Sequence, residues 1–375
     1  MTDARGNLFS MTTLLLAGAL TVTSSGAEAA SRTLGFVVPK WSFAGYQSKF
    51  WDECPEGAAI SQDEVWWRAA SKEVRSRVTN NGNLDANVRL QVPNHRGPNG
   101  EDVCWRPTLF KDPPIRQASG PISYGFNLDG AIDGQVAPGT CGHEKFPTSP
   151  NGETQVDNQL FRAIGCHVGW RNFAIVDSYA NEGRKSSGNG IVLIEVTGVD
   201  DAQNDDDVEV SFYKAVPAQF PRDPAGNILP FGSYHIETAK NVPRYVATTH
   251  GKIAKGVLSI TPRDVTLPYY GTLGAYGEMT FRKANLRLEI AADGKSASGL
   301  VGGYRDVESW WNEVKDNEVE SGHADFDCPA LYEAVHKLAD GYPDPKTGQC
   351  TAISSAYFIE AVAAFVIHPQ ETPQK

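Results

Sequence analysis

The sequence lacks the short motifs that mark the commonest catalytic and cofactor sites. It contains no GxSxG, no HExxH, no P-loop, no CxxC or CxxCH, and no GxGxxG between an expected strand and helix. These absences exclude several families of hydrolases, zinc proteases and nucleotide-binding proteins, as well as thioredoxin-like sites and covalent c-type haem. They do not exclude catalysis, because the paired carboxylates of a glycoside hydrolase can lie far apart in sequence.

Long apolar runs are also scarce. After the first thirty residues, no run reaches the roughly 20 apolar residues of a spanning helix, so the mature chain is expected to be soluble. The N-terminus itself has Arg5, an apolar stretch over 11–20, and small residues over 27–30. This order predicts a cleavable signal peptide over residues 1–30, and hence a periplasmic or secreted protein. The alternative is a buried N-terminal helix.

Positive charge is in short supply. The chain has 34 Lys and Arg against 45 Asp and Glu, which gives a formal net charge of −11. Nucleic acids and anionic membranes require a basic face, so the balance argues against both as partners. A small molecule or a glycan is the partner that this composition leaves open.

Cysteine is sparse but even in number. An exported chain with six cysteines predicts three disulfides, and the spacings do not fit a zinc site. The six positions form three couples that are close in sequence. We therefore expect the pairs Cys54–Cys104, Cys141–Cys166 and Cys328–Cys350.

Glycine and proline, at 36 and 23 residues, divide the chain into short segments. Several segments alternate apolar and polar residues, as half-buried antiparallel strands do. They lie at 33–38, 191–196, 208–213, 256–260 and 284–290. A turn at Asp293-Gly294 predicts a hairpin from the last of these to 297–303. The pattern predicts a mainly β (α+β) fold with an antiparallel β-sandwich at its core.

A few helices are expected beside the sandwich. Ser61–Val78 and Asp327–Ala339 each begin with a capping residue and continue with apolar residues at helical spacing. Residues 354–367 are almost continuously apolar, which fits either a buried helix or a central strand. The expected organisation is an N-terminal α+β segment over 31–115, a central sandwich over 116–310, and a C-terminal disulfide-linked helical segment over 311–375.

Residues 125–166 are unusually rich in oxygen donors between glycines. Calcium takes six to eight oxygens from carboxylates, amides and carbonyls in such irregular loops. The predicted ligands are Asn127, Asp129, Asp157 and Asn158, with Asp206 from a second acidic run over 204–207. The alternative is that these Asp and Asn side chains cap turns by bonding their own backbone.

The same segment offers a candidate acid/base site. His143 and His167 each lie next to a cysteine of the expected Cys141–Cys166 bridge, and Glu144 adds a carboxylate. If the bridge brought them together, they would suit a periplasmic hydrolase or lyase. Surface histidines without a function are the simpler interpretation.

Tryptophans provide a third hypothesis, a carbohydrate or apolar-ligand binder. Trp310 and Trp311 are adjacent, so one of the two rings is expected to be exposed, and a cleft floored by either would favour ligand binding. Core packing is the default alternative.

Four sequence elements resemble those of a group of uncharacterised exported bacterial proteins. They are FNLDG at 126–130, CGHEKF at 141–146, VDNQL at 156–160 and NDDDV at 204–208, and the segment 344–354 is similar to the tail of the same group. The resemblance implies export and a shared domain organisation, but no activity. The leading hypothesis is thus a non-catalytic exported protein with a Ca²⁺ site and a ligand-binding role.

Overall fold

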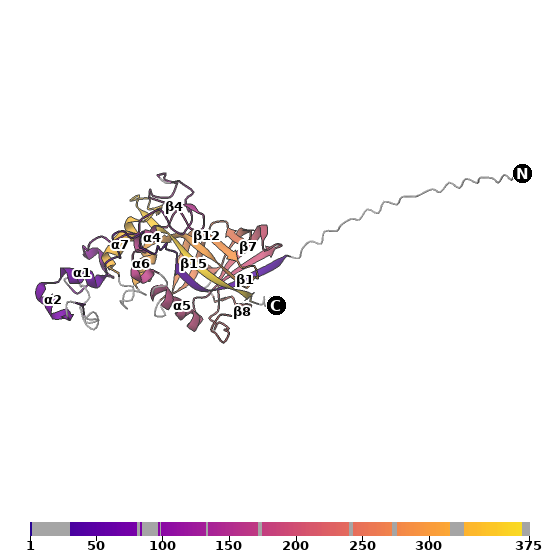
Figure 1. Cartoon of the computed structure of the whole chain (residues 1–375), viewed down its shortest axis with the longest axis horizontal. Helices are drawn as coiled ribbons and strands as arrows, with labels where there is room; N and C mark the ends of the chain where they lie inside the picture. The colour runs from indigo at the N-terminus through magenta and orange to yellow at the C-terminus, as the bar shows by residue number, and fades with distance from the viewer. Residues whose placement is uncertain are drawn as a thin grey trace. The chain divides into compact units, whose positions relative to one another are not determined.

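Antiparallel strands close into a barrel in the computed structural model (Figure 1). The structure describes residues 1, 31–80, 83–84, 97, 99–132, 134–171, 175–239, 243–271, 276–315 and 326–369. Residues 31–375 form one compact unit, to which the description below refers. The expected signal peptide at 1–30 lies, apart from Met1, outside the described residues.

The barrel strands follow one another in chain order, each antiparallel to the next. They are β1 (Arg32–Phe43), β6 (Val192–Val199), β7 (Asn204–Lys214), β9 (Ala247–Ala254), β10 (Val257–Ile260), β12 (Tyr276–Ile290), β13 (Ser296–Asp306) and β15 (Cys350–Ile367). β15 pairs back with β1, for example Trp41 with Ile359, which closes the circle. The expected sandwich is therefore corrected to a closed barrel, whereas the mainly β class with helices and disulfides is confirmed.

Shorter strands extend this sheet. β11 (Arg263–Tyr270) pairs with β12, β14 (Gly341–Pro343) pairs with β15, and β8 (Gly232–His235) runs parallel to the end of β15. Two small hairpins are separate, β2 (Thr79–Asn80) with β3 (Asn83–Leu84) and β4 (Phe146–Thr148) with β5 (Thr154–Val156).

Every second side chain along the barrel strands points into the barrel and helps to fill it. Leu286, Leu288 and Ile290 of β12 and Val210 and Phe212 of β7 belong to one buried cluster, while Arg287 and Glu289 between the β12 residues are more exposed. An eight-stranded barrel has an interior that side chains can just fill, or that holds one small ligand. Most of this interior is filled.

The helices are α1 (Gln62–Ala69), α2 (Lys72–Val78), α4 (Gln159–Ile164), α5 (Ile175–Ser187), α6 (Val307–Val314) and α7 (Cys328–Lys337). Figure 1 shows α4, α6 and α7 together at one end of the barrel. The helix expected at Ser61–Val78 is present but broken between α1 and α2, and α7 confirms the one expected at Asp327–Ala339. Residues 354–367 are a strand, because they lie within β15.

An outer segment covers one side of the barrel. Phe126 and Leu128 pack on Leu300 and Tyr304 of β13, so this strand is buried on both faces. Gly302 makes the contact feasible, because a Cβ there would lie 2.9 Å from the Phe126 ring. The segment is thus held against the sheet by apolar packing as well as by the polar contacts described below.

Three disulfides link distant parts of the chain, as Cys54–Cys166, Cys104–Cys328 and Cys141–Cys350. The number of bridges is as expected, but the predicted pairing was wrong. Partners are separated by 112, 224 and 209 residues, so folding rather than closeness in sequence brings them together. In the chain-entropy model each such loop stabilises the fold by roughly 5 kcal/mol, although the three contributions are not independent.

Strands of the barrel come from all three segments expected from the sequence, and the boundaries near 115 and 310 stay predictions. Within the described residues, no helix has the length and apolar character needed to cross a bilayer.

Candidate functional site

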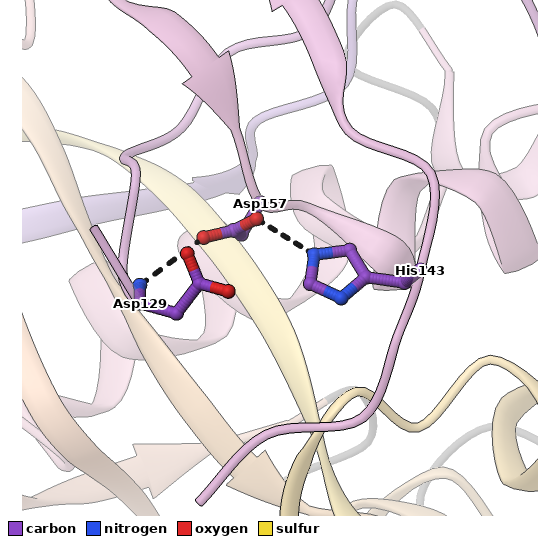
Figure 2. Close-up of side chains that lie close together, drawn as sticks. All are labelled: Asp129, His143 and Asp157. Carbon is purple, nitrogen blue, oxygen red and sulfur yellow. Dashed lines mark hydrogen bonds and ion pairs between the residues drawn. The ribbon is translucent and has the colours of Figure 1, made fainter. Parts of the chain in front are cut away.

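Asp157 joins two stretches of the outer segment. Its backbone N–H donates to the carbonyl of Phe126 at 2.8 Å, and its Oδ2 accepts from the N–H of Leu128 at 2.7 Å and of Asp129 at 3.3 Å. The side chain is fully buried. Its carboxylate therefore holds the 126–129 turn in place (Figure 2).

The turn itself is built by Asn127 and Asp129. Asn127 accepts from the N–H of Gly130 at 2.9 Å and donates to the carbonyl of Ala131, while Asp129 Oδ1 accepts from the N–H of Ala131 at 2.8 Å. Gly130 has a φ of +73°, which a residue without a side chain adopts without strain. This is the turn-capping role that the sequence offered as an alternative to metal binding.

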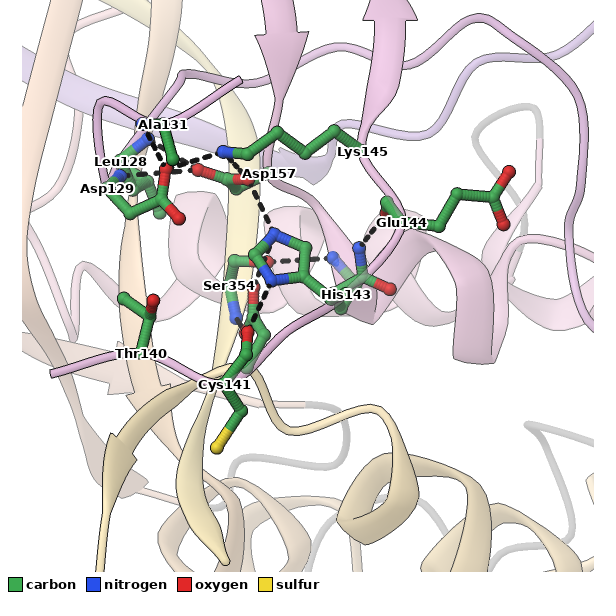
Figure 3. A network of polar contacts seen from close by, with 12 residues as sticks. Leu128, Asp129, Ala131, Thr140, Cys141, His143, Glu144, Lys145, Asp157 and Ser354 are labelled. Atoms are coloured by element: carbon green, nitrogen blue, oxygen red, sulfur yellow. Dashed lines mark hydrogen bonds and ion pairs between the residues drawn. The ribbon is translucent and has the colours of Figure 1, made fainter. Parts of the chain in front are cut away.

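Lys145 lies between these oxygens. Its Nζ donates to Asp129 Oδ1 at 2.5 Å, to Asp157 Oδ1 at 2.6 Å and to Asn127 Oδ1 at 3.1 Å (Figure 3). The Lys145 side chain is 1% exposed. Burial on its own raises the pKa of Asp129, but the bonds from Lys145 and the Ala131 N–H, together with the charges of Lys145 and His143, outweigh it and the pKa lies below its usual value.

His143 bonds through both ring nitrogens. Nδ1 donates to the carbonyl of Cys141 at 2.9 Å, and Nε2 donates to Asp157 Oδ1 at 2.8 Å. Burial lowers the pKa of His143, but the bond to Asp157 and the charge of Asp340 outweigh burial and raise it to about 9. The ring is therefore an imidazolium at neutral pH, with both nitrogens acting as donors.

Asp340 and Tyr304 complete the surroundings. Asp340 Oδ1 accepts from the N–H of Ser354, and its Oδ2 lies 3.6 Å from His143 Nε2, close enough for an ion pair but too long for a hydrogen bond. Burial raises the pKa of Asp340 to about 7 despite the charge of His143. Tyr304 is 1% exposed and its hydroxyl has no hydrogen-bond partner among the described residues. Burial and three carboxylates, Asp340 foremost, raise its pKa.

Asp129, His143 and Asp157 could hold a metal ion, because their ligand atoms lie within 4.8 Å of one another. Two carboxylates and an imidazole suit first-row transition metals, whereas Ca²⁺ prefers oxygen alone. Lys145 donates to the same Oδ1 atoms of both carboxylates. An ion at this position would therefore compete with the ammonium.

The other two expected calcium ligands lie in different surroundings. Asn158 caps α4 through its Oδ1, and its amide N–H groups donate to Ala44 and Tyr124, so its side chain is already bonded. Asp206 is exposed at an irregularity in β7, where Asp205 bonds the local backbone. The structure thus brings Asn127, Asp129 and Asp157 together, and places Asn158 and Asp206 elsewhere.

The candidate acid/base residues do not share one environment. The Glu144 side chain is 75% exposed and lies 3.6 Å from Arg162. His167 is fully buried, its ring packs edge-on against Trp170 and Phe326, and neither of its nitrogens has a hydrogen-bond partner among the described residues. Burial lowers its pKa to about 3. The bridge expected to bring His143 and His167 together is absent, because Cys141 pairs with Cys350.

Sequence reasoning missed Lys145, Asp340 and Tyr304. One signal was available for Lys145, since residues 143 and 145 project to the same side of an extended chain that leads into β4. Asp340 had no local signal, because it is 183 positions from Asp157 and only the fold brings it near.

A cavity of about 60 Å³ lies where the barrel meets α5 and α6. Three indole rings line it, those of Trp41, Trp170 and Trp310, together with other apolar side chains. Trp310 and Trp311 are both buried, at 4% and 3% exposure, so the expectation that one would be exposed is corrected. Trp310 nevertheless faces a hollow, as the ligand-binding hypothesis required.

The cavity also has a polar wall. Arg305 donates through one terminal nitrogen to both oxygens of Glu313 and through the other to the Tyr357 hydroxyl at 2.8 Å. Its Nε has no hydrogen-bond partner among the described residues, although the side chain is 3% exposed. Burial raises the pKa of Glu313 more than Arg305 lowers it. With Arg184 on the same wall, two guanidinium groups face one carboxyl group.

Comparison of the chain with family models, with curated proteins and with solved structures found no match.

Proposed function

We propose that this is an exported, non-catalytic protein that binds one small ligand in the cavity at the end of its barrel. The observation that carries the proposal is a cavity with three indole rings on its walls and a guanidinium N–H, that of Arg305 Nε, which has no hydrogen-bond partner in the part of the chain that the structure describes. Pockets for small molecules are mostly apolar with a few placed polar groups, and eight-stranded barrels can hold one such molecule.

The volume of the cavity and the charges on its wall indicate which kind of ligand fits it. About 60 Å³ is space for roughly four to six water molecules, so the ligand is a single ring or a short chain. Arg184 and Arg305 against Glu313 leave an excess of positive charge on the wall. A small carboxylate with an apolar body matches both properties.

Tryptophan fluorescence tests the proposal directly. Titration with benzoate and with the shorter butyrate should change the emission saturably, because indole rings line the cavity. Val314→Phe fills the same hollow and should abolish the change, while Val216→Phe on the exposed surface should leave it intact. The proposal is refuted if neither acid changes the emission, or if Val314→Phe still shows the change.

The burial of the charged cluster supports a non-catalytic role. General acid/base groups must reach the substrate within hydrogen-bond distance. His143 and Asp157 are 8% and 0% exposed, and His167 is fully buried with a pKa of about 3. The hydrolase or lyase alternative would need a substrate to reach these groups through the packed outer segment.

The cluster holds the outer segment against the barrel, and this proposal needs no metal ion there. Calcium was the ion expected from the sequence. Asn127, Asp129 and Asp157 supply oxygen donors for it, but His143 and Lys145 are also bonded to the same carboxylates. The unfolding temperature with EGTA and with calcium, taken up in the Discussion, tests this ion.

A glycan is the second candidate ligand, at a different place. A groove of about 350 Å³ runs along the outer face of the barrel and is lined by Tyr124 and Phe358 together with Arg287 and Glu289. The two rings meet edge to face at 4.7 Å, beside side chains that both donate and accept hydrogen bonds. Calorimetry with soluble chito- and cello-oligosaccharides tests it. Heat that Phe358→Ala removes would support a glycan site, and no heat would exclude one for these sugars.

Export is supported by the three disulfides, which form in oxidising compartments. The full chain expressed in a bacterial host should appear in the periplasm or medium with Ser31 as its first residue. Mass spectrometry of the intact protein measures this, and an uncleaved N-terminus on a cytoplasmic protein would contradict it.

A further inference from the structure

Lys145 occupies the position in the cluster where a metal ion would bind. We infer that its ammonium group is the resident cation of this carboxylate site, and that a divalent ion binds there only when the Lys145 side chain is removed. The inference is independent of the ligand proposed for the barrel cavity, because it concerns a different set of side chains.

The contacts of Lys145 match what an ammonium group needs. It has three N–H donors, and three oxygens lie within 3.1 Å of Nζ, those of Asn127, Asp129 and Asp157. Asp129 and Asp157 also belong to the group of three residues whose ligand atoms lie within 4.8 Å of one another. Ammonium and metal therefore compete for the same carboxylates.

Burial keeps the Lys145 ammonium group at the carboxylate site. Its side chain is 1% exposed, and those of Asp129 and Asp157 are 0% exposed. Lysine is almost never fully buried unless paired, and removing one partner of a buried pair typically costs 3–5 kcal/mol. An ion from solution would have to expel the ammonium from a packed interior, so the native protein should exclude it.

The surroundings retain unused oxygen donors. Asp129 Oδ2, Asp340 Oδ2 and the Tyr304 hydroxyl are buried and have no hydrogen-bond partner among the described residues. Burial and the charges of Asp340, Asp157 and Asp129 raise the pKa of Tyr304. If the Lys145 side chain were shortened, the space would contain two carboxylates, an imidazole and these oxygens, which suits Zn²⁺.

A built-in cation has a consequence for an exported protein. The 126–131 turn is connected to Asp157 through Lys145, and His143 connects the same carboxylate to the disulfide at Cys141. Because the cation is covalently part of the chain, this connection does not depend on the metal content of the medium.

Zinc binding to Lys145→Ala compared with the unmodified protein tests the inference. The unmodified protein should bind no Zn²⁺ at the cluster by calorimetry. Lys145→Ala should unfold at a lower temperature, bind one equivalent of Zn²⁺, and recover part of the lost temperature. Adding Asp129→Asn should abolish that binding. Lys185→Ala, which removes a surface lysine paired with Glu182, is the matched control. It should neither lower the unfolding temperature nor bind Zn²⁺ at the cluster.

A second measurement, made on the unmodified protein, tests the inference if Lys145→Ala fails to fold. In the unmodified protein, Lys145 should resist acetylation by acetic anhydride, scored by peptide mass spectrometry, whereas Lys185 reacts. Saturating Zn²⁺ should leave that protection unchanged. Stoichiometric zinc binding by the unmodified protein that His143→Ala removes, zinc-induced acetylation of Lys145, or a folded Lys145→Ala that binds no zinc would each overturn the inference.

Discussion

The Arg305 guanidinium lies 2.5 and 2.6 Å from the two carboxylate oxygens of Glu313, inside the wall of the barrel cavity. Both side chains are almost completely buried, at 3% and 12% exposure. A buried ion pair is weak evidence for stability, because desolvation offsets the attraction. The pair also gives the cavity a polar wall beside its indole rings.

Glu313→Gln should destabilise the protein by about 3 to 5 kcal/mol, because it leaves the buried Arg305 charge without its partner. Chemical denaturation measures the loss. Glu308→Gln is the matched control, since Glu308 pairs with His336 on the surface and its loss should cost less than about 1 kcal/mol. Equal effects of the two changes would contradict the role given to the buried pair.

His167 should make the protein sensitive to acid. Burial lowers its pKa to about 3, below the value of about 6.5 in the unfolded chain, so the unfolded state binds the proton more readily. The contribution of His167 is therefore fully present above pH 6.5 and falls as the pH drops towards 3. Between pH 6.5 and 4.5, unfolding free energy should fall by about 2 to 3 kcal/mol more than in His167→Phe, as urea denaturation can show. Parallel pH profiles would exclude this.

The disulfide pairing gives a prediction on connectivity. Peptide mapping without reduction should recover Cys54 with Cys166, Cys104 with Cys328, and Cys141 with Cys350. Replacing Cys104 and Cys328 together by Ser should lower stability by about 2 to 5 kcal/mol, because the bridge closes a loop over 224 residues. Recovery of any couple close in sequence would contradict the fold.

The sequence predicted the strands but not that they close into a barrel. Alternation at 191–196, 208–213 and 284–290 predicted β6, β7 and β12, and the Asp293-Gly294 turn predicted the hairpin to β13. Alternation is the same in a sandwich and a barrel, because each strand has one buried face in both. What decides between them is the pairing of β1 with β15, a contact between the first and the last strand of the described chain.

The candidate site was predictable to a similar extent. Asn127, Asp129 and Asp157 lie together, since all three are on one short segment, and their binding of a metal stays a prediction. The disulfide partners and Asp340 could not be inferred, because their distances along the chain exceed a hundred residues. The ammonium of Lys145 could not be placed from the sequence, because a lysine is usually a surface residue.

Calcium binding at the cluster can be tested by comparing unfolding temperatures with and without the ion. The oxidised protein in excess EGTA and in millimolar calcium should unfold at the same temperature, because Lys145 already bonds the carboxylates. Differential scanning calorimetry measures both midpoints. A rise of several degrees with calcium would show that an ion binds the native state and would return the cluster to the calcium hypothesis.

Tyr304 provides the last prediction. Its hydroxyl is buried and has no hydrogen-bond partner among the described residues, and burial together with the charges of three carboxylates raises its pKa. Removing a polar group that lacks a partner is nearly neutral or stabilising, so Tyr304→Phe should change the free energy of unfolding by between zero and about +1 kcal/mol. Tyr234→Phe is the matched control, because that hydroxyl is also buried without a partner but packs beside Phe220. A loss of more than about 1 kcal/mol in Tyr304→Phe alone would show that its hydroxyl binds a water or an ion at the cluster.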